Sequence, residues 1–247
     1  MVQKFQGRGA LVTGGSRGIG AAIVRRLAAE GADVAFTYSS SSAEAMQLVT
    51  EVQELGGQAI AIRADNADPA LVRDAVDTAI RQLGKVDILI NNAAIFALSE
   101  LDSFSLDDFD RFIAVNVRAV FSAIKAVVPQ MGDGGRIITI GSINGDRSPN
   151  KGLSLYSMSK AAVAGLTRGL ARELGERGIT INNIQPGPIS TDMNPAEGEL
   201  ADALKPLIAV GHYGEVGDIA SLVSYLASNE AGYITGASLN IDGGFGV

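Results

Sequence analysis

The chain has 247 residues, of which 47% are hydrophobic and 19% charged, a composition typical of a folded globular protein. A net charge of -7 without any basic run excludes a nucleic-acid interface built on phosphate contacts. The absence of cysteine and the single histidine, His212, exclude disulfides, thiol catalysis and multi-histidine metal sites, so we expect no metal. The N-terminus lacks an apolar signal core, and no apolar run could span a bilayer. We therefore expect a cytoplasmic protein without a membrane segment.

The first predicted elements are a short buried strand over 9–13 and a helix over 21–29, with a glycine-rich turn between them. Strand, glycine turn and helix in this order present backbone N–H groups and a helix N-terminus to a phosphate. The spacing of Gly14, Gly18 and Gly20 differs from the common G-x-G-x-x-G, and such a cluster is often only a turn. Its place at the head of a βαβ unit favours dinucleotide binding.

The second predicted strand covers 32–38 and ends in Tyr38, followed by serines that include Ser39 and Ser40. A protein specific for NAD usually carries Asp or Glu at this point to bind the ribose hydroxyls. No acid is present, and Arg17 of the glycine turn lies near the place of a ribose 2′-phosphate. Arg17 could instead be a surface charge and the serines an ordinary loop. Because arginine pairs strongly and directionally with phosphate, we favour NADP over NAD.

A helix over 42–55, a strand over 58–63 and a helix over 69–83 are predicted next. Asp65 and Asn66 follow the strand directly. Asp65 would accept a hydrogen bond from an adenine amino group, or it would only cap the turn before the next helix. The spacing alone fits both interpretations equally.

A fourth strand over 86–90 runs into the adjacent amides Asn91 and Asn92, which can tie neighbouring loops together and could also touch a ribose. A long helical region over 105–131 follows. We expect it to break or bend around Asn116, because asparagine bonds locally to the backbone and is a poor residue inside a helix. Asn116 is then either a tolerated exposed amide or a site residue that holds a water.

A strand over 135–140 places Ser142 at the carboxyl edge of the sheet, where ligands bind in open α/β sheets. The helix predicted over 156–176 begins with Tyr156 and carries Lys160 four residues later, on the same face. The lysine charge would lower the pKa of the tyrosine, and such a phenol can exchange a proton with an oxyanion. Taken alone, this spacing is also common on solvent-facing helices.

A strand over 179–185 ends abruptly at Pro186 and Gly187. The least regular segment, 192–212, contains prolines, glycines and an apolar patch, and its position after a strand suits a lid over the site. A helix over 215–227 and a last strand over 237–241 complete the series. Because no linker or repeat interrupts the alternation, we expect a single α/β domain over the whole chain, residues 1–247, with a parallel sheet.

Several motifs occur in one order along nearly the whole chain: Thr13-Gly14-x-x-x-Gly18-x-Gly20, Asn91-Asn92-Ala93, Asn116, Ser142, Tyr156-x-x-x-Lys160, Pro186-Gly187 and Asp242-Gly243. In this set the chain resembles the short-chain dehydrogenase/reductase family, and it is most similar to 3-oxoacyl-[acyl-carrier-protein] reductases. The runs at 141–147 and 185–189 also resemble a cyclic-di-GMP-binding biofilm-dispersal subgroup. The resemblance implies a Rossmann fold, a homotetramer, and a doubly wound parallel sheet of about seven strands with helices on both faces.

The resemblance further implies an NADPH-dependent oxidoreductase that reduces a ketone or 3-oxoacyl carbonyl to a secondary alcohol. Tyr156 would protonate the carbonyl oxygen, Ser142 would hold the same oxygen, and Lys160 would lower the pKa of the tyrosine and bind the ribose. Asn116 would anchor a water that resupplies the proton. The alternative is a cyclic-di-GMP-binding regulatory protein on the same fold, and the complete catalytic set favours the enzyme.

The residues expected to contact NADP(H) come from the glycine turn, the strand ends and the catalytic helix: Gly14, Ser16, Arg17, Gly18, Ile19, Gly20, Tyr38, Ser39, Ser40, Asp65, Asn66, Asn92, Ala93, Tyr156, Lys160, Pro186, Gly187, Ile189 and Thr191. Within this set, Ile189 and Thr191 would hold the nicotinamide carboxamide. The candidate substrate-pocket residues are Ile95, Phe96, Asn144, Leu153, Met193 and His212. His212 is by default a surface or capping residue. The loop over 143–155 is expected to decide which small-molecule carbonyl is reduced.

Overall fold

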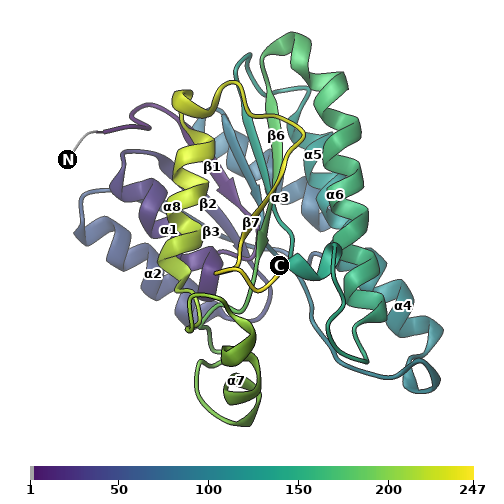
Figure 1. Cartoon of the computed structure of the whole chain (residues 1–247). Helices are drawn as coiled ribbons and strands as arrows, with labels where there is room; N and C mark the ends of the chain where they lie inside the picture. Colours follow the sequence, from purple (N-terminus) through teal and green to yellow (C-terminus); the bar gives the residue numbers. More distant parts are fainter. Residues whose placement is uncertain (1–2) are drawn as a thin grey trace.

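A seven-stranded sheet, parallel throughout, runs through the centre of the molecule in the order β3-β2-β1-β4-β5-β6-β7 (Figure 1). This computed structural model describes residues 3–247, so residues 1 and 2 of the expected domain lie outside the described part. The strands are β1 (Gly9–Val12), β2 (Asp33–Tyr38), β3 (Gln58–Arg63), β4 (Ile88–Asn91), β5 (Arg136–Ile140), β6 (Thr180–Pro186) and β7 (Ser238–Ile241). The strand order reverses between β1 and β4, and ligands of doubly wound sheets bind at such a switch point.

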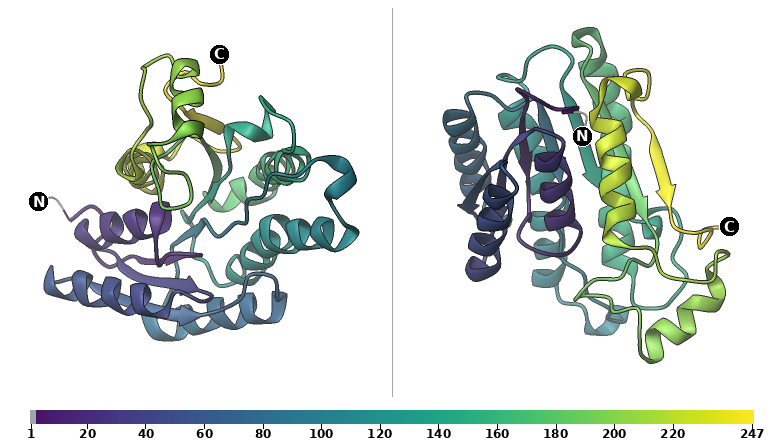
Figure 2. Two further views of the ribbon diagram at one scale, coloured as in Figure 1. Left: turned by 90° about the horizontal axis from the view of Figure 1, so that it is seen from below. Right: turned by 90° about the vertical axis from the view of Figure 1, so that its left-hand side faces the viewer.

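Helices cover both faces of this sheet (Figure 2). Their bounds are α1 (Gly18–Ala29), α2 (Ser42–Glu54), α3 (Pro69–Leu83), α4 (Leu106–Phe112), α5 (Ala119–Val127), α6 (Ser154–Leu174), α7 (Glu199–Leu204) and α8 (Val216–Ala227). The apolar cluster on one face joins α1, α2 and α8 to the sheet, and the cluster on the other face joins α3, α5 and α6 to it. The expected doubly wound α/β architecture is therefore confirmed.

The central strands β1 and β4 are apolar over nearly their whole length because both of their faces are covered. In β4, for example, Ile88, Leu89 and Ile90 are all fully buried. Local signals set the ends of α3: the Asp68 carboxylate accepts from two backbone N–H groups of the first turn, and Gly84 ends the helix at a φ of 79°. Strand and helix bounds deduced from such signals agree with the structure to within a few residues.

The region expected as one helix over 105–131 is divided by a π-helical segment over Ile113–Arg118, between α4 and α5. The expected break around Asn116 thus takes the form of a π-helical interruption of the α-helix. The segment over 192–212 is less irregular than expected, because it contains α7 and a 3-10 turn over Lys205–Leu207. Within residues 3–247, no helix combines the length and apolar character that crossing a membrane requires.

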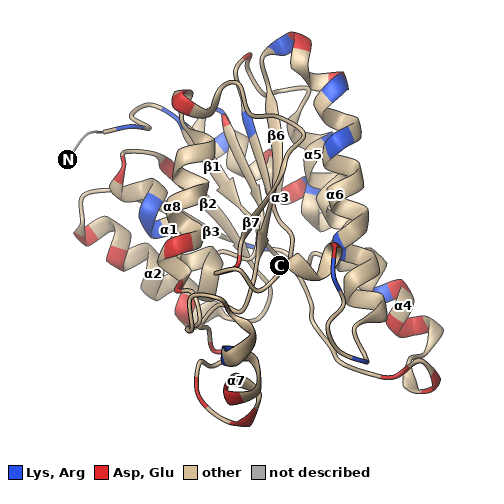
Figure 3. Ribbon diagram, in the orientation of Figure 1, with Lys and Arg blue, Asp and Glu red and all other residues tan. Residues whose placement is uncertain are grey.

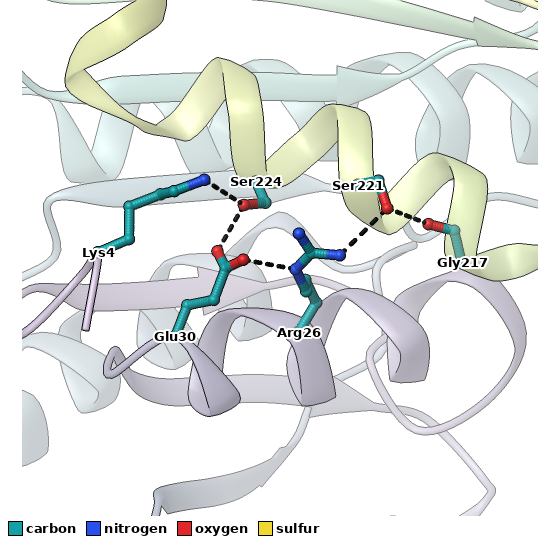
Figure 4. Close-up of polar contacts among 6 residues, drawn as sticks. All are labelled: Lys4, Arg26, Glu30, Gly217, Ser221 and Ser224. Atoms are coloured by element: carbon teal, nitrogen blue, oxygen red, sulfur yellow. Dashed lines mark hydrogen bonds and ion pairs between the residues drawn. The ribbon is translucent and has the colours of Figure 1, made fainter. Parts of the chain in front are cut away.

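A polar network fastens α8 to α1 on one face of the sheet (Figure 4). Glu30 at the end of α1 accepts from the Ser224 hydroxyl of α8 and from Arg26 Nε, and Lys4 Nζ donates to the same serine. Arg26 also donates to Ser221 Oγ over 3.1 Å. Most other charged residues lie on outer helices and loops (Figure 3). The network thus joins the C-terminal half of α1 to α8.

Candidate active site

A cleft of about 810 Å³ opens along the carboxyl edge of the sheet. The glycine turn and the ends of β2, β4, β5 and β6 form its floor, and α6 and the segment after β6 form its sides. Every residue expected to contact NADP(H) lines this cleft, as do the catalytic candidates Ser142, Tyr156 and Lys160. Two expected residues do not line it: Asn116 lies behind the wall, and His212 is exposed elsewhere and bonds the Tyr213 carbonyl through Nδ1.

The glycine turn requires glycine where its backbone folds against neighbouring segments. Gly14 has a φ of +64°, and a Cβ there would lie 2.9 Å from the Cα of Ala93. A Cβ on Gly20 would lie 2.2 Å from the Gly14 carbonyl oxygen. Asn92 closes the turn by donating from Nδ2 to the carbonyl oxygens of Thr13 and Gly14 over 3.1 and 2.8 Å. Asn92 therefore ties neighbouring loops together as expected, and its contact with a ribose stays a prediction.

The N-terminus of α1 faces the cleft and suits an anion. Arg17, the residue before the helix, makes no capping bond with its side chain, and the first turn, which lies within the described residues, contains no acid. These N–H groups and the positive end of the helix dipole favour a phosphate. Arg17, Ser39 and Ser40 are exposed and line the same end of the cleft, where they supply positive charge and hydroxyl donors.

Asp65 sits in a turn at the edge of the cleft. Its Oδ1 accepts from the Ala67 N–H over 2.9 Å, while the following Asp68 caps α3. The turn-forming interpretation of Asp65 is therefore correct. Its carboxylate remains exposed and lines the cleft, so contact with an adenine stays a prediction.

Tyr156 and Lys160 face the cleft from one side of α6. Lys160 is 5% exposed, and its Nζ donates to the Ile140 carbonyl over 2.8 Å. The same Nζ lies 5.6 Å from the centroid of the Tyr156 ring. Burial lowers the pKa of Lys160 to about 8, because the protein interior disfavours the charged form. The Phe96 ring packs edge-on against the Tyr156 ring, with centroids 5.0 Å apart.

The pKa of Tyr156 departs from the sequence expectation. Burial raises it, and the hydrogen bond with the Ser142 side chain lowers it by a smaller amount. The expected net decrease caused by Lys160 is therefore wrong for the chain by itself. The physical reason is that the loss of hydration destabilises the phenolate more than its hydrogen bond and nearby charges stabilise it. The Lys160 ammonium donates to the Ile140 carbonyl instead.

Ser142 lies two residues after the end of β5 and caps the 3-10 turn over Ile143–Gly145. Its Oγ accepts from the Asn144 N–H over 3.1 Å. Because that bond uses a lone pair of the oxygen, the hydroxyl hydrogen is left to donate toward the Tyr156 oxygen or a carbonyl beside it. Ser142 is 7% exposed, so this donor acts in a setting largely shielded from water.

Asn116 is 3% exposed, which excludes the interpretation as a tolerated surface amide. Its Oδ1 accepts from the Ile95 N–H over 2.8 Å, and its Nδ2 donates to the Ile95 carbonyl and to Ser159 Oγ, each over 3.0 Å. Ser159 in turn donates to the Tyr156 carbonyl. The Asn116 amide of the π-helical segment thus joins the segment after β4 to α6.

Comparison with known proteins decides the family. The family model described as enoyl-(acyl carrier protein) reductase matches residues 14–246. The cyclic-di-GMP-binding biofilm dispersal mediator protein of Escherichia coli K12 is 48% identical over 242 residues, which cover 98% of each chain. The chain belongs to the short-chain dehydrogenase/reductase family. The predicted resemblance is therefore confirmed.

Two further members of the short-chain dehydrogenase/reductase family are similar over almost their whole length. The 3-oxoacyl-[acyl-carrier-protein] reductase FabG of Staphylococcus epidermidis RP62A is 40% identical over 240 residues, covering 96% of this chain and 98% of that protein. A short-chain dehydrogenase of Burkholderia cenocepacia J2315, solved in complex with NADP, is 52% identical with a TM-score of 0.97, and the match covers 99% of this chain and 100% of that one.

Sequence reasoning missed several residues of this family member's cleft. Phe245, near the C-terminus, is 4% exposed and packs with Ile143 and Ile208. Arg111 of α4 also lines the cleft. The local signal for Phe245 was its position between two glycines shortly after the last strand. The sequence around Arg111 contains no signal for a cleft residue except the charge of Arg111 itself. The other wall residues missed include Leu98 and Val115, which lie outside both the expected substrate loop and the expected lid.

Proposed function

We propose that the protein is an NADPH-dependent reductase that converts a ketone or 3-oxoacyl carbonyl to a secondary alcohol. The observation that carries this proposal is one cleft that holds a phosphate-compatible glycine turn together with Ser142, Tyr156 and Lys160. The relative solved with NADP and the relatives named 3-oxoacyl-[acyl-carrier-protein] reductase support it.

The cleft fits a dinucleotide phosphate. The absence of a side chain at Gly14 and Gly20 allows neighbouring backbone segments to pack closely in the turn. The start of α1, which has no side-chain cap, offers N–H donors to a phosphate. Arg17 and the serines after β2 match a 2′-phosphate, and no acid competes for the ribose hydroxyls at the described end of that strand. Lys160, Ile189 and Thr191 would hold the ribose and carboxamide at the nicotinamide end.

When bound, NADPH supplies the hydride that the carbonyl carbon receives. Tyr156 donates its phenolic proton to the carbonyl oxygen, and Ser142 donates a hydrogen bond to that oxygen as negative charge develops on it. The protonated Lys160 stabilises the phenolate that Tyr156 becomes. A water held near Asn116 and Lys160 returns the proton. The raised pKa of Tyr156 favours its protonated form, which is the form that a reduction requires.

Three wider features belong to the same proposal. Residues 1–247 form one domain, in which the segment over 192–212 acts as a lid, since Met193, Leu200 and Leu204 of that segment line the cleft. The enzyme is a cytoplasmic homotetramer, as the family resemblance implies. Exposed apolar side chains such as Phe109 of α4 and Phe121 of α5 offer contact surface for other subunits.

The test is the oxidation of NADPH by the purified protein in the presence of a panel of small ketones and 3-oxoacyl thioesters. Tyr156→Phe is expected to lower kcat about 1,000-fold while NADPH binding, measured by fluorescence titration, is retained. Tyr233→Phe, a change at a fully exposed tyrosine, is the matched control. Undiminished turnover in Tyr156→Phe would contradict the mechanism, and no turnover of any ketone by the unaltered protein would contradict the function.

A second function is favoured by one observation: the Escherichia coli relative at 48% identity is named as a cyclic-di-GMP-binding protein. We therefore also infer that this chain is a candidate for binding cyclic di-GMP, with or without catalysis. Calorimetric titration with cyclic di-GMP tests this inference. Absence of binding at micromolar ligand would remove it, and competition with NADPH would indicate a shared cleft.

A further inference from the structure

Gln185 on β6 reaches from the interior of the sheet to the turn that carries Ser142. It is 0% exposed and does not line the cleft. Its Nε2 donates to the Ser142 carbonyl over 3.2 Å and to Asp146 Oδ2 over 3.0 Å. A residue that touches neither substrate nor cofactor therefore holds the backbone of a residue that is proposed to touch the reacting oxygen.

The orientation of the Gln185 amide follows from its partners. Both the Ser142 carbonyl and the Asp146 carboxylate accept hydrogen bonds, so only the NH₂ end of the amide can face them. The Gln185 Oε1 is consequently buried with no partner among residues 3–247. An unpaired buried acceptor is unfavourable, and an apolar side chain of similar size would avoid it. The favourable contribution of the Gln185 amide therefore comes from the two hydrogen bonds that its Nε2 donates.

These bonds act on a turn that is tightly confined. The Ser142 carbonyl also accepts from the Gly145 N–H over 2.9 Å. A Cβ on Gly145 would lie 3.0 Å from the backbone of Lys160, so the turn packs directly against the catalytic helix. The direction of the Ser142 hydroxyl toward Tyr156 therefore depends on how the sheet holds this turn.

We propose that Gln185 is a positioning residue that orients Ser142 toward the Tyr156 hydroxyl by holding the Ser142 carbonyl and the Asp146 carboxylate. The consequence for turnover rests on the function proposed above, whereas the consequence for the Tyr156 hydroxyl does not. Loss of either donated bond lets the turn shift and moves the Ser142 hydroxyl relative to the Tyr156 hydroxyl.

The first test reads the Tyr156 hydroxyl without using activity. Protein labelled with ¹³C at the tyrosine ζ carbon has a Tyr156 resonance that is assigned by its loss in Tyr156→Phe. Gln185→Met and Gln185→Glu are expected to shift this resonance in the direction that Ser142→Ala shifts it. Asn182→Leu is the matched control, because Asn182 is a buried amide on the opposite face of β6 that bonds Ile234 and Ala237. An unshifted resonance in folded Gln185→Met would overturn the proposal.

The second test is a kinetic cycle. Gln185→Met is expected to lower kcat about tenfold, with the KM for NADPH unchanged, because a displaced Ser142 donor stabilises the reacting oxygen less. In a Ser142→Ala background the same change is expected to have no further effect. When Asp146→Asn is combined with Gln185→Glu, the amide at position 146 can donate to the carboxylate at position 185, so that the hydrogen bond runs in the opposite direction. This double variant is expected to recover part of the kcat lost in Gln185→Glu. Full additivity of Gln185→Met and Ser142→Ala would overturn the proposal.

If the unaltered protein reduces no ketone, the proposed function fails and the resonance test still decides the role of Gln185. If turnover is normal and the resonance does not move, Gln185 serves stability alone. The lowered melting temperature expected of both Gln185→Met and Asn182→Leu does not distinguish these roles, whereas the resonance does.

Discussion

The cleft has two halves that are built in different ways. The half around the glycine turn is held by backbone contacts between neighbouring elements, for example where a Cβ on Gly20 would lie 2.2 Å from the Gly14 carbonyl. The half around Ser142 is held by side chains from distant segments, as where Arg147 donates to the Phe245 carbonyl over 2.6 Å. The comparison indicates that the glycine turn depends on close approach of backbone, which only glycine allows, whereas the Ser142 turn depends on hydrogen bonds from side chains of other segments.

Among the changes that compare the two halves, the largest effect is expected in the half around the glycine turn. Gly20→Ala should weaken NADPH binding about 100-fold or more, because its Cβ would meet the rigid Gly14 carbonyl and the Asn92 amide. Fluorescence titration with NADPH measures this effect. Gly169→Ala, a helical glycine of α6 with nothing within 4 Å of the added Cβ, is the control and should bind normally. Equal NADPH affinity in Gly20→Ala and Gly169→Ala would contradict the proposed binding of NADPH at the glycine turn.

A smaller effect concerns the choice of cofactor. Arg17→Ser should weaken NADPH binding about 10- to 100-fold, because it removes a charge-assisted bond to the 2′-phosphate. NADH affinity should hardly change. Arg25→Ser, on α1 but paired with Glu51, serves as the control. An equal loss of affinity for NADPH and NADH in Arg17→Ser would mean that Arg17 does not bind the 2′-phosphate.

A change in the half around Ser142 should affect the KM for the ketone and leave NADPH affinity unchanged. Phe245→Ala removes a ring that packs with Ile143 and Ile208 and lies under the Arg147 guanidinium. We expect the KM for the ketone to rise about tenfold, since the pocket wall loosens, with NADPH affinity unchanged. Val247→Ala, at a fully exposed position, controls for a general effect of the tail. A loss of NADPH binding in Phe245→Ala would show that the two halves are not independent.

The smallest effect is a dependence of stability on pH. Burial lowers the pKa of Lys160 from 10.5 to about 8, so between these values the folded chain binds fewer protons than the unfolded chain. The free energy of unfolding should therefore rise with pH from about 8, by about 1 kcal/mol at pH 9 relative to Lys160→Met. Urea unfolding of both proteins at pH 7, 8 and 9 measures it. Parallel curves for the two proteins would contradict the burial of the ammonium.

Much of this molecule follows from local sequence. The alternating strands and helices, the glycine turn and the pair Tyr156 and Lys160 were predictable, because each depends on residues close together in the chain. The family resemblance added Ser142 and Asn116 to the catalytic set. His212 shows the limit of such reasoning, since a lone titratable side chain in an irregular segment carries no signal of where it points.

The parallel α/β architecture and the set of residues at the carboxyl edge of the sheet follow from sequence patterns alone, because apolar periodicity and strand direction leave few alternatives. The behaviour of those residues depends instead on the folded structure. That structure raised the pKa of Tyr156 by burial, turned the Asn116 amide toward Ile95 and Ser159, and brought Gln185 and Phe245 to the Ser142 turn. Burial and side-chain hydrogen bonds depend on contacts between segments far apart in the chain, and local patterns do not record them.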